Sequence, residues 1–181
     1  MIYYLPGHGG RLSTGLGQAL ISRGYEVIGR ELHGEFKTLP FQVQIDHISE
    51  DLQGQFWEEN AHVIANSFGA YLFLHAQAQL PSYPGKVLLL SPIVGDFGEE
   101  DRKMFFIPPR ADKIRSLAEA GAMPIPRDCE VHVGSEDWQS NPANVLSLGK
   151  LLNIRVAVVS DAGHNLGKDY VGEVLDRWLS K

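Results

Sequence analysis

The feature that most constrains the fold is a regular alternation of short apolar runs with longer segments that are apolar on one side only. Six runs are too short for most helices, and several are nearly continuous Val, Ile and Leu, which is typical of strands covered on both faces. They are residues 2–5, 26–28, 62–65, 86–90, 130–133 and 154–159. This alternation predicts a three-layer α/β/α sandwich with about six mainly parallel strands.

The segments between these runs carry apolar residues at three- and four-residue spacing, which predicts the helices that cover the sheet. The expected helices are residues 14–23, 46–58, 68–80, 112–120, 142–152 and 169–179. The helix that begins at residue 142 has a clear start signal, because Asn141 is a favourable N-cap residue and Pro142 suits the first helical position.

The chain of 181 residues is long enough to bury one substantial core, so we expect a single domain, residues 1–181. Residues 92–127 interrupt the alternation and are rich in Gly, Pro and Phe. Connections of this length are commonly lids or binding loops. We therefore expect a short lid-like insertion in which Phe97, Phe105 and Phe106 form an apolar wall for substrate. Packing of these rings in the core is the alternative.

Charge and composition argue against several classes of partner. The formal net charge of −6 leaves no basic stripe for a nucleic acid backbone. No stretch approaches the roughly 18 apolar residues that a membrane span needs. The single cysteine, Cys129, cannot form an internal disulfide, and the N-terminal residues do not resemble a secretory signal. We expect a cytoplasmic protein that binds neither nucleic acid nor membrane, and its oligomeric state is left open.

Ser67 lies at the apex of a predicted strand, turn and helix, in the ANSFG segment of residues 65–69. A nucleophilic serine on such a turn has a strained backbone, so the residues two before and two after it must be small. Ala65 and Gly69 meet this requirement, although glycine is commoner than alanine at the first position. A serine that caps a helix is the simpler interpretation of the pentapeptide taken alone.

His164 follows the last predicted strand, on a loop from which its imidazole can reach the carboxyl edge of the sheet. Ser67 is expected at the same edge. The acid that orients a catalytic histidine should follow another strand, and Asp137, after the fifth apolar run, is the preferred candidate. Glu136 beside it and Asp96 after the fourth run remain alternatives.

The PGHGG segment, residues 6–10, follows the first predicted strand, and its glycines allow backbone N–H groups to turn toward a reaction centre. We expect the N–H of Gly10, with Gly9 as second choice, to bind a negatively charged oxygen together with the N–H of Phe68. His8 is expected to brace the loop.

The same glycines do not form a dinucleotide-binding motif, because Leu12 stands where the third glycine would be. The sequence also contains no Walker motif and no His, Cys and carboxylate spacing typical of a metal site. We therefore expect no cofactor and no metal.

The turn at Ser67, the PGHGG segment (called the glycine loop below), the acid and the histidine together resemble the α/β-hydrolase superfamily over almost the whole chain. The resemblance rests on ANSFG at Ser67, GSEDW at Asp137, AGHNLG at His164 and PGHGG at Gly9 and Gly10. It is strongest to short, nearly lid-less serine hydrolases of the retinoblastoma-binding protein 9 type and to small bacterial esterases. It implies a truncated fold that lacks the N-terminal antiparallel strands, and hydrolysis of an ester, thioester or amide.

These motifs are compatible with two functions from different classes. The first is a carboxylesterase-like acyl hydrolase of a small-molecule acyl substrate, with Ser67 as nucleophile, His164 as general base and Asp137 as the orienting acid. The second is a catalytically silent binding protein on the same fold. The presence of all three triad residues favours the enzyme.

Overall fold

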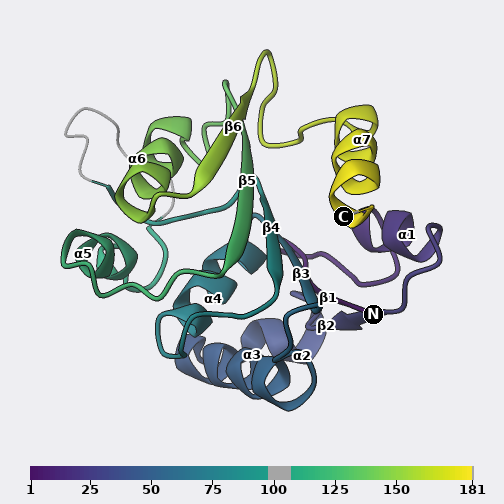
Figure 1. The fold of residues 1–181 in the computed structure, drawn as a ribbon, viewed down its shortest axis with the longest axis horizontal. Coiled ribbons are helices and arrows are strands. Elements are labelled where there is room, and N and C mark those ends of the chain that lie inside the picture. The colour runs from purple at the N-terminus through teal and green to yellow at the C-terminus, as the bar shows by residue number, and fades with distance from the viewer. Residues whose placement is uncertain (98–106, 181) are drawn as a thin grey trace.

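The computed structural model describes residues 1–97 and 107–180, which form one six-stranded sheet with helices on both faces (Figure 1). The sheet order is β2-β1-β3-β4-β5-β6, and all five pairings are parallel. The strands are β1 (Ile2–Leu5), β2 (Val27–Gly29), β3 (His62–Asn66), β4 (Lys86–Leu90), β5 (Asp128–Gly134) and β6 (Arg155–Val159). Each of the six predicted runs is therefore a strand.

The helices form the two outer layers of the predicted three-layer sandwich. They are α1 (Leu16–Ile21), α2 (Gly34–Thr38), α3 (Phe41–Gln55), α4 (Phe68–Gln77), α5 (Lys113–Glu119), α6 (Pro142–Leu152) and α7 (Lys168–Leu179). Helices α1 and α7 cover one face, to the right of the sheet in Figure 1, and the other helices lie on its opposite side. None of the helices in the described part of the chain is long and apolar enough to cross a membrane.

Each face of the sheet has its own core because side chains alternate along every strand. In β1, Tyr3 and Leu5 belong to the larger core under α3 to α6, whereas Ile2 and Tyr4 belong to the smaller core under α1 and α7. All four side chains are buried. The nearly continuous apolar character of the strands therefore reflects a sheet covered on both faces.

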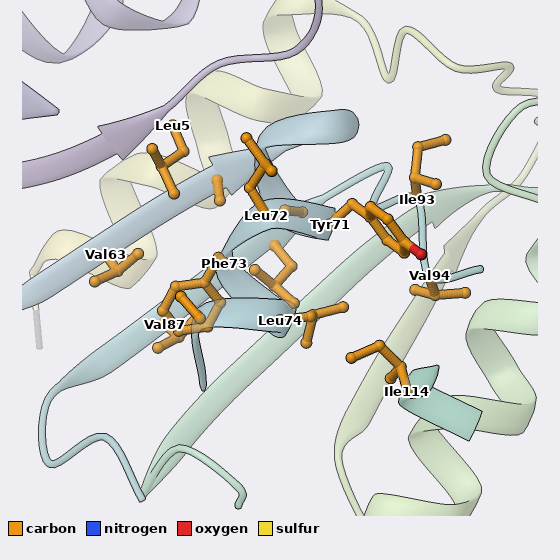
Figure 2. Packing of buried hydrophobic residues seen from close by; sticks show 14 of the residues in the cluster. Leu5, Val63, Tyr71, Leu72, Phe73, Leu74, Val87, Ile93, Val94 and Ile114 are labelled. Carbon is orange, nitrogen blue, oxygen red and sulfur yellow. The ribbon is translucent and has the colours of Figure 1, made fainter. Parts of the chain in front are cut away.

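Helix α4 is the central element of the larger core, and all ten of its residues are buried. Figure 2 shows Tyr71 to Leu74 of this helix among side chains from the strands and from α5. The Tyr71 hydroxyl donates a hydrogen bond of 2.7 Å to the carbonyl of Pro109. A helix that is apolar on every side is stable only when it is enclosed in this way.

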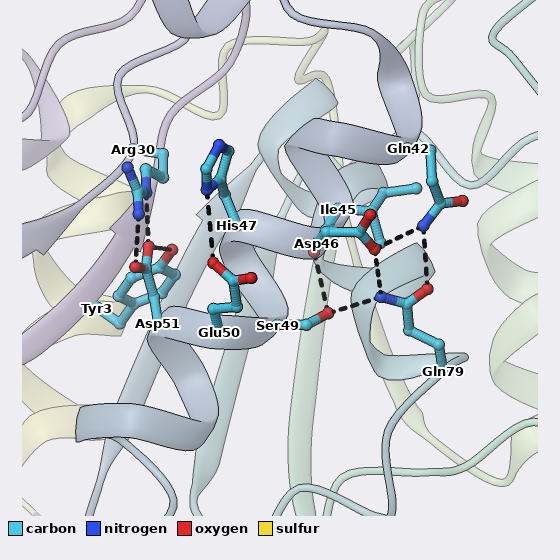
Figure 3. A network of polar contacts seen from close by, with 10 residues as sticks. All are labelled: Tyr3, Arg30, Gln42, Ile45, Asp46, His47, Ser49, Glu50, Asp51 and Gln79. Carbon is cyan, nitrogen blue, oxygen red and sulfur yellow. Dashed lines mark hydrogen bonds and ion pairs between the residues drawn. The ribbon is translucent and has the colours of Figure 1, made fainter.

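Charged and polar contacts fasten α3 to β1, to the end of β2 and to Gln79, which lies just after α4 (Figure 3). The Arg30 guanidinium donates two hydrogen bonds of 2.6 Å to the two carboxyl oxygens of Asp51. The Tyr3 hydroxyl also donates to Asp51, at 2.7 Å. The Gln79 amide donates to Asp46 and to the Ser49 hydroxyl. The contacts of Asp51 fix the position of α3 against the first two strands.

The largest errors in the predicted helices concern α2 and α3. Helix α3 begins at Phe41 and ends at Gln55, in place of the predicted 46–58, because Pro40 occupies its N-cap and the residues before 46 already pack on the core. The short helix α2 was not predicted. Helix α1 begins only at Leu16, because Gly15 has a φ of 55° that no right-handed helix contains.

The close approach of α4 to β1 generates a stability prediction. A methyl group on Gly69 would lie 2.3 Å from the carbonyl oxygens of Leu5 and Pro6, and backbone atoms cannot move aside cheaply. Gly69→Ala should therefore lower the free energy of unfolding by about 1–3 kcal/mol. The same substitution at Gly54, an exposed position of α3 with open space around it, should raise it by about 0.5–1 kcal/mol.

Urea unfolding followed by circular dichroism measures both changes. Equal effects of the two glycine substitutions would contradict the steric account of the α4 and β1 contact.

Candidate active site

Ser67 occupies the sharp turn between β3 and α4, at the carboxyl edge of the sheet. Its backbone has φ 53° and ψ −123°, an unusual conformation for a residue other than glycine. The contact of Gly69 with β1 requires a small residue two positions later, and Ala65 is fully buried two positions earlier. Strand β1 separates β2 from β3 in the sheet, so this turn lies beside the point where the strand order reverses, a usual place for ligands.

A continuous hydrogen-bonded chain joins the three residues that the sequence singled out. His164 Nε2 lies 2.8 Å from Ser67 Oγ. His164 Nδ1 lies 2.9 Å from Asp137 Oδ2 and 3.1 Å from Oδ1. The serine follows β3, the acid follows β5 and the histidine follows β6. The parallel sheet therefore brings together three loops that are far apart in the sequence.

The Asp137 carboxyl is buried and is held by backbone groups as well as by His164. The N–H groups of Gln139 and Ser140 both donate to Oδ1 at 2.9 Å. Burial alone raises the pKa of this carboxyl, but the hydrogen bonds from His164, Ser140 and Gln139 and the nearby imidazole outweigh burial, so its pKa lies below the ordinary value. Asp137 is therefore maintained as a carboxylate beside the imidazole.

Ser140 is a site residue that the sequence did not single out. Its hydroxyl donates a 2.6 Å hydrogen bond to the Ser91 carbonyl, which follows β4, and lies 3.3 Å from His164 Nδ1. The buried Ser140 thus connects the β4 end to the loop of the acid. The available signal was its position three residues after Asp137, where a backbone N–H can bond the carboxyl.

The two alternative acids lie elsewhere. Glu136 is exposed, and its N–H donates to the carbonyl of Ala162. Asp96 is exposed as well, and its N–H donates to the carbonyl of Ala111. The carboxyl that contacts His164 is that of Asp137.

The glycine loop lies against Ser67, but not in the expected way. A methyl group on Gly7 would lie 2.9 Å from Ser67 Cβ and 3.3 Å from its Oγ. The N–H of Gly9 donates to the Leu32 carbonyl at 2.8 Å, and the N–H of Gly10 donates to the Gly7 carbonyl at 2.9 Å. In this structure both predicted loop donors are therefore engaged in backbone hydrogen bonds, which argues against the expected role of Gly9 and Gly10.

His8 and Phe68 pack on each other beside the serine. Their rings are stacked with centroids 4.2 Å apart, which agrees with the expected bracing of the loop by His8. Burial, and to a smaller extent the nearby Lys37, lowers the pKa of His8. Phe68 is the first residue of α4. The N–H groups of the first helical turn have no acceptor within the helix and point out of its N-terminal end, and the Phe68 N–H is one of them.

The expected aromatic wall is described only in part. Phe97 is partly buried and packs against the larger core. Phe105 and Phe106 lie outside the described residues. The predicted helix at 112–120 is present as α5, whose Ile114 is buried in the same core. Among the described residues, no group of three or more His, Cys, Asp and Glu side chains is arranged to hold a metal ion.

A parallel sheet in this order, with a serine on a strained turn between strand and helix, is the architecture of the α/β-hydrolase fold. The first strand of the described residues, β1, is the one that the glycine loop follows. No family model matches the chain, and no curated protein matches its sequence.

Solved structures with the same fold match over nearly the whole chain. The ydeN gene product of Bacillus subtilis has a TM-score of 0.67 at 14% identity, covering 99% of this chain and 98% of that one. A carboxylesterase of the thaumarchaeon Nitrososphaera gargenis has a TM-score of 0.64 at 15% identity, with coverages of 99% and 89%. The carboxylesterase CesB of Bacillus subtilis has a TM-score of 0.63 at 14% identity, with coverages of 98% and 83%. The chain has the α/β-hydrolase fold.

The contacts of Asp137 generate a prediction about stability and pH. Because its pKa in the folded state lies below the unfolded value of about 3.9, the ionised carboxyl stabilises the fold above about pH 4, and this contribution is lost as the pH falls further. Asp137→Asn lacks it. The difference in free energy of unfolding between wild type and Asp137→Asn should therefore narrow between about pH 5 and pH 3.

Urea titrations at several pH values measure this difference. Glu136→Gln alters the exposed neighbouring carboxyl and serves as the control, which should follow the wild type. A constant difference between wild type and Asp137→Asn over this range would refute the stabilising role of the carboxylate.

Proposed function

We propose that this protein is a serine-dependent acyl hydrolase of the carboxylesterase type, acting on a small-molecule ester, thioester or amide. The observation that carries the proposal is the hydrogen-bonded chain from Ser67 Oγ through His164 to the buried Asp137. The strained turn that presents Ser67 supports it, because backbone strain of this kind clusters at functional sites. The solved structures that share the fold include carboxylesterases.

In this mechanism His164 Nε2 accepts the Ser67 proton while Oγ attacks the substrate carbonyl. Asp137 holds the imidazole with Nδ1 protonated and stabilises the imidazolium that forms. The imidazolium then protonates the leaving group as the bond to the acyl carbon breaks. Water attacks the acyl-enzyme with His164 again as base, and Ser67 regains its proton when the acid leaves.

The negative oxygen of the tetrahedral intermediate needs two N–H donors. We assign one to Phe68, as expected from the sequence, because its N–H is at the start of α4 directly after the nucleophile. We assign the other to the backbone N–H of His8, in place of those of Gly10 and Gly9. Gly7 packs against Ser67, and the His8 N–H belongs to the peptide bond that directly follows Gly7. Stacking of His8 on Phe68 supports this arrangement by fixing one donor residue against the other.

Labelling with a fluorophosphonate probe tests the nucleophile. Wild type should be labelled once, at Ser67, and Ser67→Ala should lose labelling and lower ester turnover by roughly 10⁴ to 10⁶ with the fold intact. His164→Ala should lose comparable activity. Folded wild-type protein that neither reacts with the probe nor hydrolyses p-nitrophenyl esters would favour the silent binding protein instead.

Comparison of two acids tests the third member of the triad. Asp137→Asn removes the charge that stabilises the imidazolium, so kcat/KM for an ester should fall by about 10²- to 10⁴-fold. Asp96→Asn is the matched control, since Asp96 is exposed and follows the neighbouring strand. Loss of activity in Asp96→Asn alone would move the acid to the end of β4.

A further inference from the structure

A cleft of about 860 Å³ lies between α1 and α7, on the face of the sheet opposite α4. Its inner end is formed by Asn66, Leu90 and Ser91 at the ends of β3 and β4, together with His164. Its volume is within the range of small-molecule sites, which is about 300–1,000 Å³. The cleft therefore adjoins the proposed catalytic site and is large enough for part of a substrate.

The walls of the cleft are mainly apolar. Leu16 and Ala19 line it from α1, Val171 and Leu175 line it from α7, and Leu166 lines it from the loop after His164. Such walls favour an alkyl or aryl group over a strongly hydrated one.

The charge of the cleft is opposite to that of the whole chain. The chain has a formal net charge of −6, yet among the described residues that line the cleft there are two cationic side chains, Arg23 and Lys168, and no Asp or Glu. Arg23 is already paired with Asp176 at 2.7 Å and donates to the carbonyls of Ala19 and Gly172, so it ties α1 to α7. Lys168 is exposed and forms no ion pair with any described residue, which makes it the charge that a ligand can meet.

The position of His164 decides which part of a substrate the cleft receives. After Ser67 Oγ bonds to the acyl carbon, the proton on Nε2 passes to the leaving oxygen or sulfur as its bond to that carbon breaks. The leaving group must therefore lie within hydrogen-bond reach of His164. His164 lines the cleft, whereas Ser67, the glycine loop and Phe68 do not.

We infer that the cleft between α1 and α7 binds the leaving group of the substrate, and that it selects an apolar alcohol or thiol that carries an anionic group. The apolar body lies between α1 and α7, and Lys168 meets a carboxylate or phosphate at the outer end. This inference rests on the proposed acyl-hydrolase function and adds the substrate class on the leaving side.

Three acetate esters with one acyl group and different alcohols test the charge preference. They are the acetates of phenol, meta-hydroxybenzoate and meta-hydroxyphenyltrimethylammonium. The kcat/KM ratio of the anionic ester to phenyl acetate should fall roughly two- to fivefold in Lys168→Gln and recover in Lys168→Arg. The ratio for the cationic ester should rise in Lys168→Gln. Lys150→Gln, an exposed lysine on α6, should keep the wild-type ratios. Ratios between esters cancel any general loss of activity.

A bulky substitution in the cleft tests whether the cleft binds the leaving group. Ala19→Phe should lower kcat/KM for naphthyl acetate more than for methyl acetate, while the dependence of kcat/KM on acyl length in a series of phenyl esters stays as in wild type. A change confined to acyl length would overturn the inference and make the cleft an acyl site. Unchanged ester ratios in Lys168→Gln would overturn the charge preference.

Failure of the underlying function is distinguishable from these outcomes. If wild type neither reacts with a fluorophosphonate nor hydrolyses any of the acetates, the acyl-hydrolase proposal fails and the inference fails with it. If Ser67-dependent hydrolysis is present and the variants do not change the ratios, only the inference fails.

Discussion

The site depends on the close contact between α4 and the end of β1, which is possible only because residue 69 is glycine. This contact requires the chain to turn sharply after β3, and Ser67 takes the positive φ of that turn. A conformation of this kind costs on the order of 1–3 kcal/mol and persists only where surrounding packing imposes it. The fully buried α4 supplies that packing, so the larger of the two described cores also holds Ser67 in place.

The other half of the site is held by polar contacts. Within the loop after β5, the N–H groups of Gln139 and Ser140 donate to the Asp137 carboxyl. The Ser140 hydroxyl joins this loop to the end of β4. A methyl group on Gly134 would lie 2.2 Å from the Ala162 carbonyl, so the end of β5 also packs closely on the loop that carries His164. These contacts align the acid and the imidazole, which in the proposed mechanism reduces the reorganisation that catalysis requires.

The two faces of the sheet differ in how much space lies between the sheet and its covering helices. The face under α4 is occupied by a dense set of aromatic and aliphatic side chains (Figure 2). The face under α1 and α7 has the smaller core, and Arg23 bridges the two helices across a cleft that reaches His164. One face therefore provides the rigidity of the turn at Ser67, and the other provides space next to the imidazole.

The sequence by itself determined the six strands, their parallel arrangement and the location of Ser67 and His164 at strand ends, because apolar period and strand-end location are local properties. It left three acids open, since only the folded loops show which carboxyl reaches the imidazole. It assigned oxyanion donors to Gly9 and Gly10, whose N–H groups bond to the carbonyls of Leu32 and Gly7 once the loop is folded. The α1 and α7 cleft joins segments from both ends of the chain. Tertiary structure decided these features because hydrogen-bond partners and cavities depend on residues distant in sequence.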